Sequence, residues 1–232
     1  MGRVSLLFIT LFFVASFANA KDFQISIIRD ASYHAGEAED VIDGETWIAI
    51  VESDGKSIAK HVKISAKTEY DGLLDAKDGP FTGKVIESVP NTVFLLKGFG
   101  LREGADVQSI PLDSELSQNL TKPYELKGAK GNVRLDDIGG LKLNTGEYEF
   151  DDAHQFVLKL DGKDIPLTEV QVFNDALPYL IWAGDLNNDG YPDFVANISY
   201  HYNISKMALF MSYTYDGSLD YKKVAERQAT GC

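Results

Sequence analysis

The chain reads Tyr-Leu-Ile-Trp-Ala-Gly-Asp-Leu-Asn-Asn-Asp-Gly-Tyr-Pro-Asp-Phe-Val-Ala-Asn-Ile-Ser-Tyr over residues 179–200. Apolar residues dominate 179–183, and apolar residues alternate with smaller or polar ones over 194–200, as is typical of β-strands. Between these runs lies a polar stretch that begins at Asp185 and ends at Asp193. The pattern therefore predicts two consecutive strands joined by a connection rich in side-chain oxygens.

The connection places an oxygen-bearing side chain at alternate positions, and Gly190 stands where such a loop must turn sharply. Alternating oxygen donors around one point suit a hard cation that takes six to eight oxygen ligands. Carboxylates crowded within a few ångströms also repel one another, and a nearby dication relieves that repulsion. The sequence thus predicts a Ca²⁺ site whose ligands are Asp185, Asn187, Asp189, Asp193 and, through its backbone carbonyl, Tyr191.

Two other interpretations fit the stretch less well. An EF-hand would need a bidentate Glu at the twelfth position, where Ala196 stands, and helical flanks where strands are predicted. An ordinary polar turn explains Asn188-Asp189-Gly190, but it does not require carboxylates at Asp185 and Asp193 as well. A calcium loop that connects two β-strands is therefore the expectation.

Residues 182–194 resemble an FG-GAP/VCBS-type repeat, the integrin-like calcium loop with the pattern Asp-x-Asp-x-Asp-Gly-x-x-Asp. The resemblance covers about residues 179–213 and implies the same five ligands. The longer run through 201–203, Leu209-Phe210 and 230–232 is also similar to uncharacterised exported bacterial proteins with one such repeat, a resemblance that implies no activity. Because the chain holds a single copy and a propeller needs about four blades or more, the sequence argues against a full propeller.

The rest of the chain predicts an all-β protein made of antiparallel sandwich or barrel-like halves. Asp-Gly pairs between apolar alternations are strong hairpin signals, and they predict hairpins around Asp54-Gly55, Asp161-Gly162 and Asp216-Gly217. With the calcium loop as its first connection, the C-terminal part is predicted to form a four-stranded meander. The predicted strands are 23–28, 46–51, 58–64, 92–96, 106–110, 146–150, 154–160, 165–173, 179–183, 194–200, 207–213 and 219–225.

A short helix is predicted over 113–122, bracketed by Pro111 and Pro123. This segment is the candidate boundary between two strand-rich domains. An immunoglobulin-like β-rich domain is expected over 21–122, and a second β-rich domain with the calcium loop over 123–232.

Residues 1–20 have the features of a secretory signal peptide: Arg3, an apolar run over 6–17, and the small-x-small sequence Ala18-Asn19-Ala20. The expected location is therefore secreted or periplasmic. No later segment is apolar enough to span a membrane. The net charge of −13 argues against nucleic-acid binding, which needs Lys and Arg to replace counterions. The single cysteine, Cys232, has no partner for an internal disulfide.

No nucleophile elbow, zinc-protease motif or phosphate-binding glycine loop occurs in the sequence. His201 is the one candidate general base near the predicted calcium loop, although a packed or surface histidine is the simpler interpretation. Trp47 and Trp182 could serve a ligand platform, but aromatic residues also build β-cores. No catalytic or cofactor-binding residue is predicted.

The expected function is that of an exported, non-catalytic binding module with a structural calcium and a protein or glycan partner. The alternatives are a secreted hydrolase or an enzyme accessory domain, and an extracellular inhibitor or assembly factor.

Overall fold

The computed structural model describes residues 24–53, 55–109, 124–138, 142–144, 147–149, 153–160, 163–169, 171–172, 176 and 178–231. These residues form antiparallel β-sheets without a helix, so the predicted all-β class is confirmed. Because the described part holds no helix, it contains none long and apolar enough to cross a membrane. The predicted helix over 113–122 lies outside the described residues.

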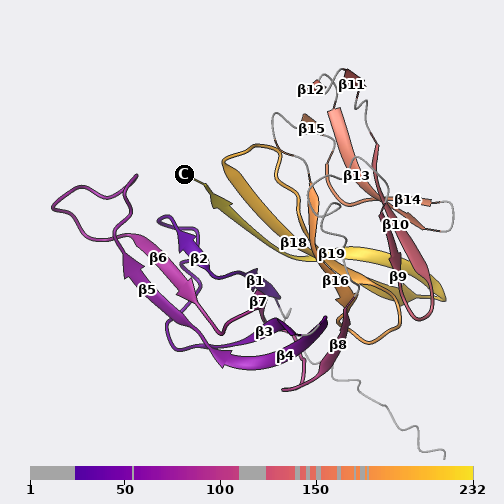
Figure 1. The fold of residues 1–232 in the computed structure, drawn as a ribbon, viewed down its shortest axis with the longest axis horizontal. Coiled ribbons are helices and arrows are strands. Elements are labelled where there is room, and N and C mark those ends of the chain that lie inside the picture. The colour runs from indigo at the N-terminus through magenta and orange to yellow at the C-terminus, as the bar shows by residue number, and fades with distance from the viewer. Residues whose placement is uncertain are drawn as a thin grey trace, which may run out of the picture.

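The largest sheet is nearly closed, like a barrel (Figure 1). Within the described residues it has nine strands, each antiparallel to its neighbours. Their order is β1 (Ser26–Ile28), β7 (Thr92–Lys97), β3 (Thr46–Ser53), β4 (Lys56–Lys63), β8 (Asp106–Ser109), β16 (Tyr179–Asp185), β17 (Asp193–Asn197), β18 (Ile204–Tyr215) and β19 (Ser218–Thr230).

Three smaller sheets accompany the barrel-like sheet in the described part of the chain. The first has the order β14 (Lys163–Pro166), β13 (Ala153–Leu160), β10 (Asn132–Ile138) and β9 (Tyr124–Lys127), and β15 (Gln171–Val172) also pairs with β13. The second is β2 (Ala31–Tyr33), β6 (Gly83–Glu87) and β5 (Ser65–Glu69). The third pairs β11 (Lys142–Asn144) with β12 (Glu147–Glu149). In Figure 1 the β2–β6–β5 sheet and the β14–β13–β10–β9 sheet lie on opposite sides of the barrel-like sheet.

Strand β17 has apolar residues on both faces, and all five of its residues are buried. Phe194 and Ala196 belong to a hydrophobic cluster shared with the β14–β13–β10–β9 sheet. Val195, on the opposite face, belongs to the cluster inside the barrel-like sheet, together with Trp182 and Leu209. The loop that precedes β17 is thus anchored to the most buried part of the molecule.

The two ends of the barrel-like sheet meet through Arg227 on β19. Its Nε donates to the carbonyl oxygen of Ile27 on β1 at 3.3 Å, and its two Nη atoms form a bidentate ion pair with Asp40 at 2.6 and 2.7 Å. Nη1 also donates to the carbonyl oxygen of Glu37 at 2.9 Å. The Arg227 hydrogen bonds hold the pKa of Asp40 below its usual value.

The order of the strands in the C-terminal meander, β16–β17–β18–β19, is as predicted. The hairpin of β3 and β4 around residues 54–55 is also confirmed. Both tryptophans are core residues, since Trp47 and Trp182 are each 1% exposed. The division at residue 122 stays a prediction, and the nine-stranded sheet contains strands from both sides of it.

Candidate metal centre

The oxygen-rich loop is the connection between β16 and β17, where the sequence placed it. Asp185 is the last residue of β16 and Asp193 is the first residue of β17. The chain turns through two positive φ angles, 58° at Asn188 and 90° at Gly190. Asparagine and glycine adopt this backbone region more readily than other residues, which explains why the turn has these two residues at these places.

Asp193 is the central acceptor of the loop, and its side chain is inaccessible to solvent. Its Oδ2 accepts the backbone N–H of Leu186 at 2.7 Å and of Asn187 at 3.3 Å. Its Oδ1 accepts the backbone N–H of Ser212 at 2.8 Å and the hydroxyl of Ser212 at 2.9 Å. The carboxylate therefore ties the start of the loop to β18, two strands away from β16.

Burial raises the pKa of Asp193 to about 7, against the opposing effect of its hydrogen-bond donors. The neighbouring Tyr221 is also buried, and its hydroxyl donates to the carbonyl oxygen of Pro192 at 2.8 Å. Burial, together with the negative charge of Asp193, raises the pKa of Tyr221. The inner wall of the loop is thus a poorly solvated region that holds a carboxylate.

The other two carboxylates organise the backbone of the loop. Asp185 accepts the N–H groups of Asp189 at 3.0 Å and Gly190 at 2.8 Å, one on each oxygen. Asp189 accepts the N–H of Tyr191 at 2.8 Å, and its Oδ2 lies 2.9 Å from the hydroxyl of Ser212, whose one proton it shares with Asp193. The amide oxygen of Asn187 accepts the N–H of Asp189 at 3.0 Å. The predicted ligands therefore occupy one hydrogen-bonded turn.

The β9–β10 turn packs directly against this loop. The backbone N–H of Lys130 donates to the carbonyl oxygen of Gly190 at 2.8 Å, and its ammonium donates to the carbonyl oxygen of Asp189. A Cβ atom added at Gly128 would lie 2.8 Å from the carbonyl oxygen of Gly190 and from Cδ of Pro192. Only glycine permits this close approach, so the turn and the loop fit each other backbone to backbone.

The donor set fits a hard cation in part. A carboxylate offers about four acceptor positions and an amide oxygen about two. Asp185 uses two positions and the oxygen of Asn187 uses one. Asp189 accepts the N–H of Tyr191 and a side-chain N–H of Asn187 at 3.2 Å, and it competes with Asp193 for the hydroxyl proton of Ser212. Asp193 accepts three backbone N–H groups and shares the single hydroxyl proton of Ser212 with Asp189, so it has at most one free position for a metal unless it releases a donor.

The charge of the loop favours a bound cation, but the present arrangement of its side chains does not form a metal site. Within the described residues, no Lys, Arg or His side chain forms an ion pair with Asp185, Asp189 or Asp193. Equally, no three Asp, Glu, His or Cys side chains of the described part form a group that could hold a metal ion. The carboxylates of the loop therefore have no ion-pair partner among the described residues, although the Lys130 ammonium lies on the carbonyl oxygen of Asp189. A bound cation would require some of the loop side chains to turn toward it.

A cleft of about 550 Å³ adjoins the loop on the side of the barrel-like sheet. One wall is the segment 99–102 with 105–108, and the other is 185–188. The first wall is fixed to β4, because the N–H of Ala59 donates to the carbonyl oxygen of Ala105 at 3.0 Å and Nε2 of His61 lies 2.7 Å from the carbonyl oxygen of Leu101. The loop thus forms part of a surface large enough for a ligand.

His201 lies in the turn between β17 and β18, eight positions after Asp193. Its Nδ1 accepts the N–H of Asn203 at 3.4 Å, and its ring packs against Tyr202 with 4.7 Å between centroids. These contacts indicate a histidine packed in a turn.

Sequence reasoning missed three participants: Ser212, Lys130 and Gly128. They lie between 19 and 64 positions from the loop residues that they contact, and no local pattern identifies Lys130 or Gly128. Ser212 is a buried polar residue directly after the apolar run 207–211, and this break in the apolar pattern was the available signal.

Comparison with family models, curated proteins and solved structures finds no match to this chain. The resemblance to the FG-GAP/VCBS-type repeat therefore remains a prediction that depends on residues 179–213.

Proposed function

We propose that the chain is an exported calcium-binding β-protein that acts as a non-catalytic binding module. The observation that carries the proposal is the concentration of Asp185, Asp189 and Asp193 in one nine-residue connection without an ion pair to any described residue. Three carboxylates so placed repel one another, and a divalent cation would offset that repulsion. The resemblance in sequence supports the same ion and the same ligands.

The role proposed for the ion is structural. Asp185 ends β16 and Asp193 begins β17, so a cation held between them would resist separation of these two strands. Because only the folded chain brings the ligands together, calcium would stabilise the fold by mass action. The ion would also fix residues 185–188, which form one wall of the adjacent cleft. A protein or glycan partner recognised at that cleft would then bind more tightly in the presence of calcium.

Export is part of the proposal and depends on the predicted signal peptide over residues 1–20. Extracellular calcium modules commonly bind with dissociation constants of about 10⁻⁴ to 10⁻³ M. The amide of Asn187, in place of a further carboxylate, is consistent with that modest range.

Thermal unfolding with chelator and with added calcium tests this proposal, using wild type and Asp189→Asn. The substitution keeps an oxygen that can accept the N–H of Tyr191 but removes one charge from the loop. Wild type should melt at a higher temperature in calcium than in chelator, and Asp189→Asn should lose most of that difference. Terbium luminescence, sensitised through Tyr191, gives a direct measure of binding.

Asp216→Asn is the matched control, because Asp216 precedes a glycine in the exposed β18–β19 turn with φ of 51°. That variant should keep the full calcium response. Equal melting temperatures for wild type with and without calcium, together with no terbium signal, would reject the calcium site.

A further inference from the structure

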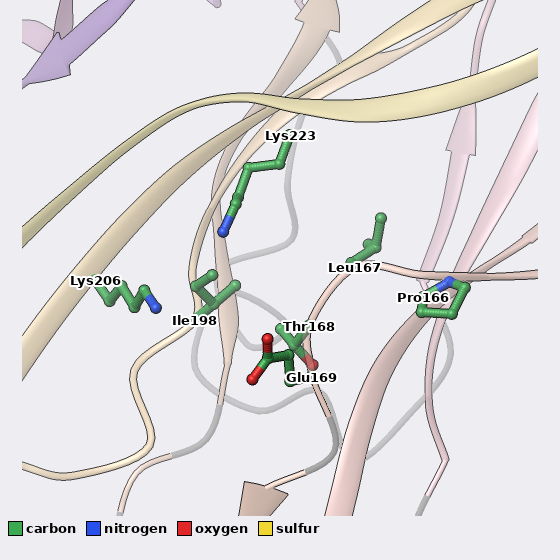
Figure 2. A pocket seen from close by; sticks show the side chains of 7 residues that line it. All are labelled: Pro166, Leu167, Thr168, Glu169, Ile198, Lys206 and Lys223. Carbon is green, nitrogen blue, oxygen red and sulfur yellow. The ribbon is translucent and has the colours of Figure 1, made fainter.

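A second cleft, of about 370 Å³, lies between the β14–β13–β10–β9 sheet and the meander (Figure 2). None of the residues that line this cleft belongs to the calcium loop, 185–193. Its lining combines a small apolar surface with charges of both signs. The residues are Pro166, Leu167, Thr168, Glu169, Ile198, Lys206 and Lys223.

The apolar surface is rigid. Leu167 and Ile198 are 7% and 3% exposed and belong to the cluster between the two sheets. The N–H of Leu167 donates to the carbonyl oxygen of Phe156 at 2.8 Å, and Oγ1 of Thr168 accepts the N–H of Phe156 at 3.0 Å. Since the Thr168 oxygen is used as an acceptor, its hydroxyl proton is available to donate.

The positive side of the cleft comes from Lys206 on β18 and Lys223 on β19. Both ammonium groups pair with one carboxylate, that of Glu226, with Lys206 Nζ at 3.2 Å. Two positive charges against one negative charge leave a net positive charge. Each ammonium has three N–H donors, so donors remain for a ligand oxygen.

The negative side is Glu169, which is exposed and stands on the opposite wall. Among these described residues, no ion pair joins Glu169 to Lys206 or Lys223. In Figure 2 the two ammonium groups and the Glu169 carboxylate are all turned toward Ile198. Opposite charges therefore face one apolar spot without contacting each other.

We propose that this cleft binds a free amino acid with an apolar side chain. The carboxylate of the ligand would accept from Lys206 and Lys223, its ammonium would donate to Glu169, and its side chain would cover Leu167 and Ile198. A ligand with only a negative charge would meet repulsion from Glu169, and one with only a positive charge would meet repulsion from the lysines. The inference does not depend on the calcium site.

NMR titration of the methyl groups of Ile198 and Leu167 tests the proposal with three compounds that share the 3-methylbutyl chain. Leucine carries both charges, 4-methylpentanoate lacks the ammonium, and 3-methylbutylamine lacks the carboxylate. Leucine should bind about fivefold more tightly than either analogue, because a partly exposed ion pair contributes at most about that factor. No saturable shift with leucine, or equal binding of the three compounds, would overturn the proposal.

Two variants locate the charges. Glu169→Gln should remove the preference for leucine over 4-methylpentanoate, and Lys223→Met should weaken leucine binding while retaining the apolar stem. Lys222→Met is the control, since Lys222 is the neighbouring exposed residue of β19 and does not line the cleft. If Lys223→Met and Lys222→Met bind leucine alike, the assignment of the lysine is wrong. The calcium response of all three variants should equal that of wild type, which separates this result from the calcium proposal.

Discussion

Replacing Asp193 with alanine should cause the largest loss of stability of any single change in the oxygen-rich loop. The Asp193 side chain is 0% exposed and accepts three backbone N–H groups, those of Leu186, Asn187 and Ser212. It also lies 2.9 Å from the Ser212 hydroxyl, whose proton it shares with Asp189. Alanine would leave the N–H groups of Leu186 and Ser212 buried without an acceptor. An unsatisfied buried donor costs about 1–3 kcal/mol, so the free energy of unfolding should fall by about 3–5 kcal/mol.

Urea unfolding followed by tryptophan fluorescence is a suitable assay, because Trp47 and Trp182 are both buried and report on the barrel-like sheet. The measurement should be made in chelator, so that the loss reflects hydrogen bonds and not a bound metal. Ser212→Ala is the matched comparison, since it removes one hydroxyl donor and leaves the backbone N–H in place, at a cost of about 1 kcal/mol. If Asp193→Ala loses no more stability than Ser212→Ala, the carboxylate does not hold the loop as described.

Two further predictions concern the contacts that hold the sheets together. Gly128→Ala should lower the melting temperature, because the new methyl group would lie 2.8 Å from the carbonyl oxygen of Gly190. Gly100→Ala is the control and should melt like wild type, because a Cβ atom added at Gly100 has no other atom within 4 Å. Arg227→Ala should lower the free energy of unfolding by about 1–2 kcal/mol near neutral pH, after discounting for solvent screening at half-exposed Asp40. The pKa of Asp40 is lowered in the fold, so its contribution is present above about pH 4 and is lost as the pH falls through the folded value. Urea unfolding at several pH values should therefore show a smaller gap between wild type and Arg227→Ala in acid, and a gap that is constant with pH would contradict the role of Asp40.

Local patterns in the sequence were sufficient to predict the meander and its turns. Asp-Gly at 216–217 predicted a tight hairpin, and both residues have positive φ, 51° and 78°. The apolar run over 92–96 predicted a strand buried on two sides, and Phe94 and Leu95 do lie in different hydrophobic clusters. These features depend on residues close together in the chain.

The order of strands in the barrel-like sheet could not be predicted. The alternation of apolar and polar residues shows which face of a strand is buried, but not which distant strand pairs with it. Strand β8 pairs with β4 on one side and β16 on the other, and neither contact has a local signal. The same limit applies to the candidate site. Alternating oxygens identified the loop, but Asp193 also accepts a hydrogen bond from Ser212, nineteen positions away, which no local pattern predicts.

The meeting of β1 and β19 has a consequence for how the chain folds. Ile27 and Arg227 are 200 positions apart, so the barrel-like sheet closes only after nearly the whole chain is available. Contacts of such long range slow folding, because the entropy of a large loop is lost before the contact forms. The barrel-like sheet therefore cannot close until synthesis of the chain is nearly finished.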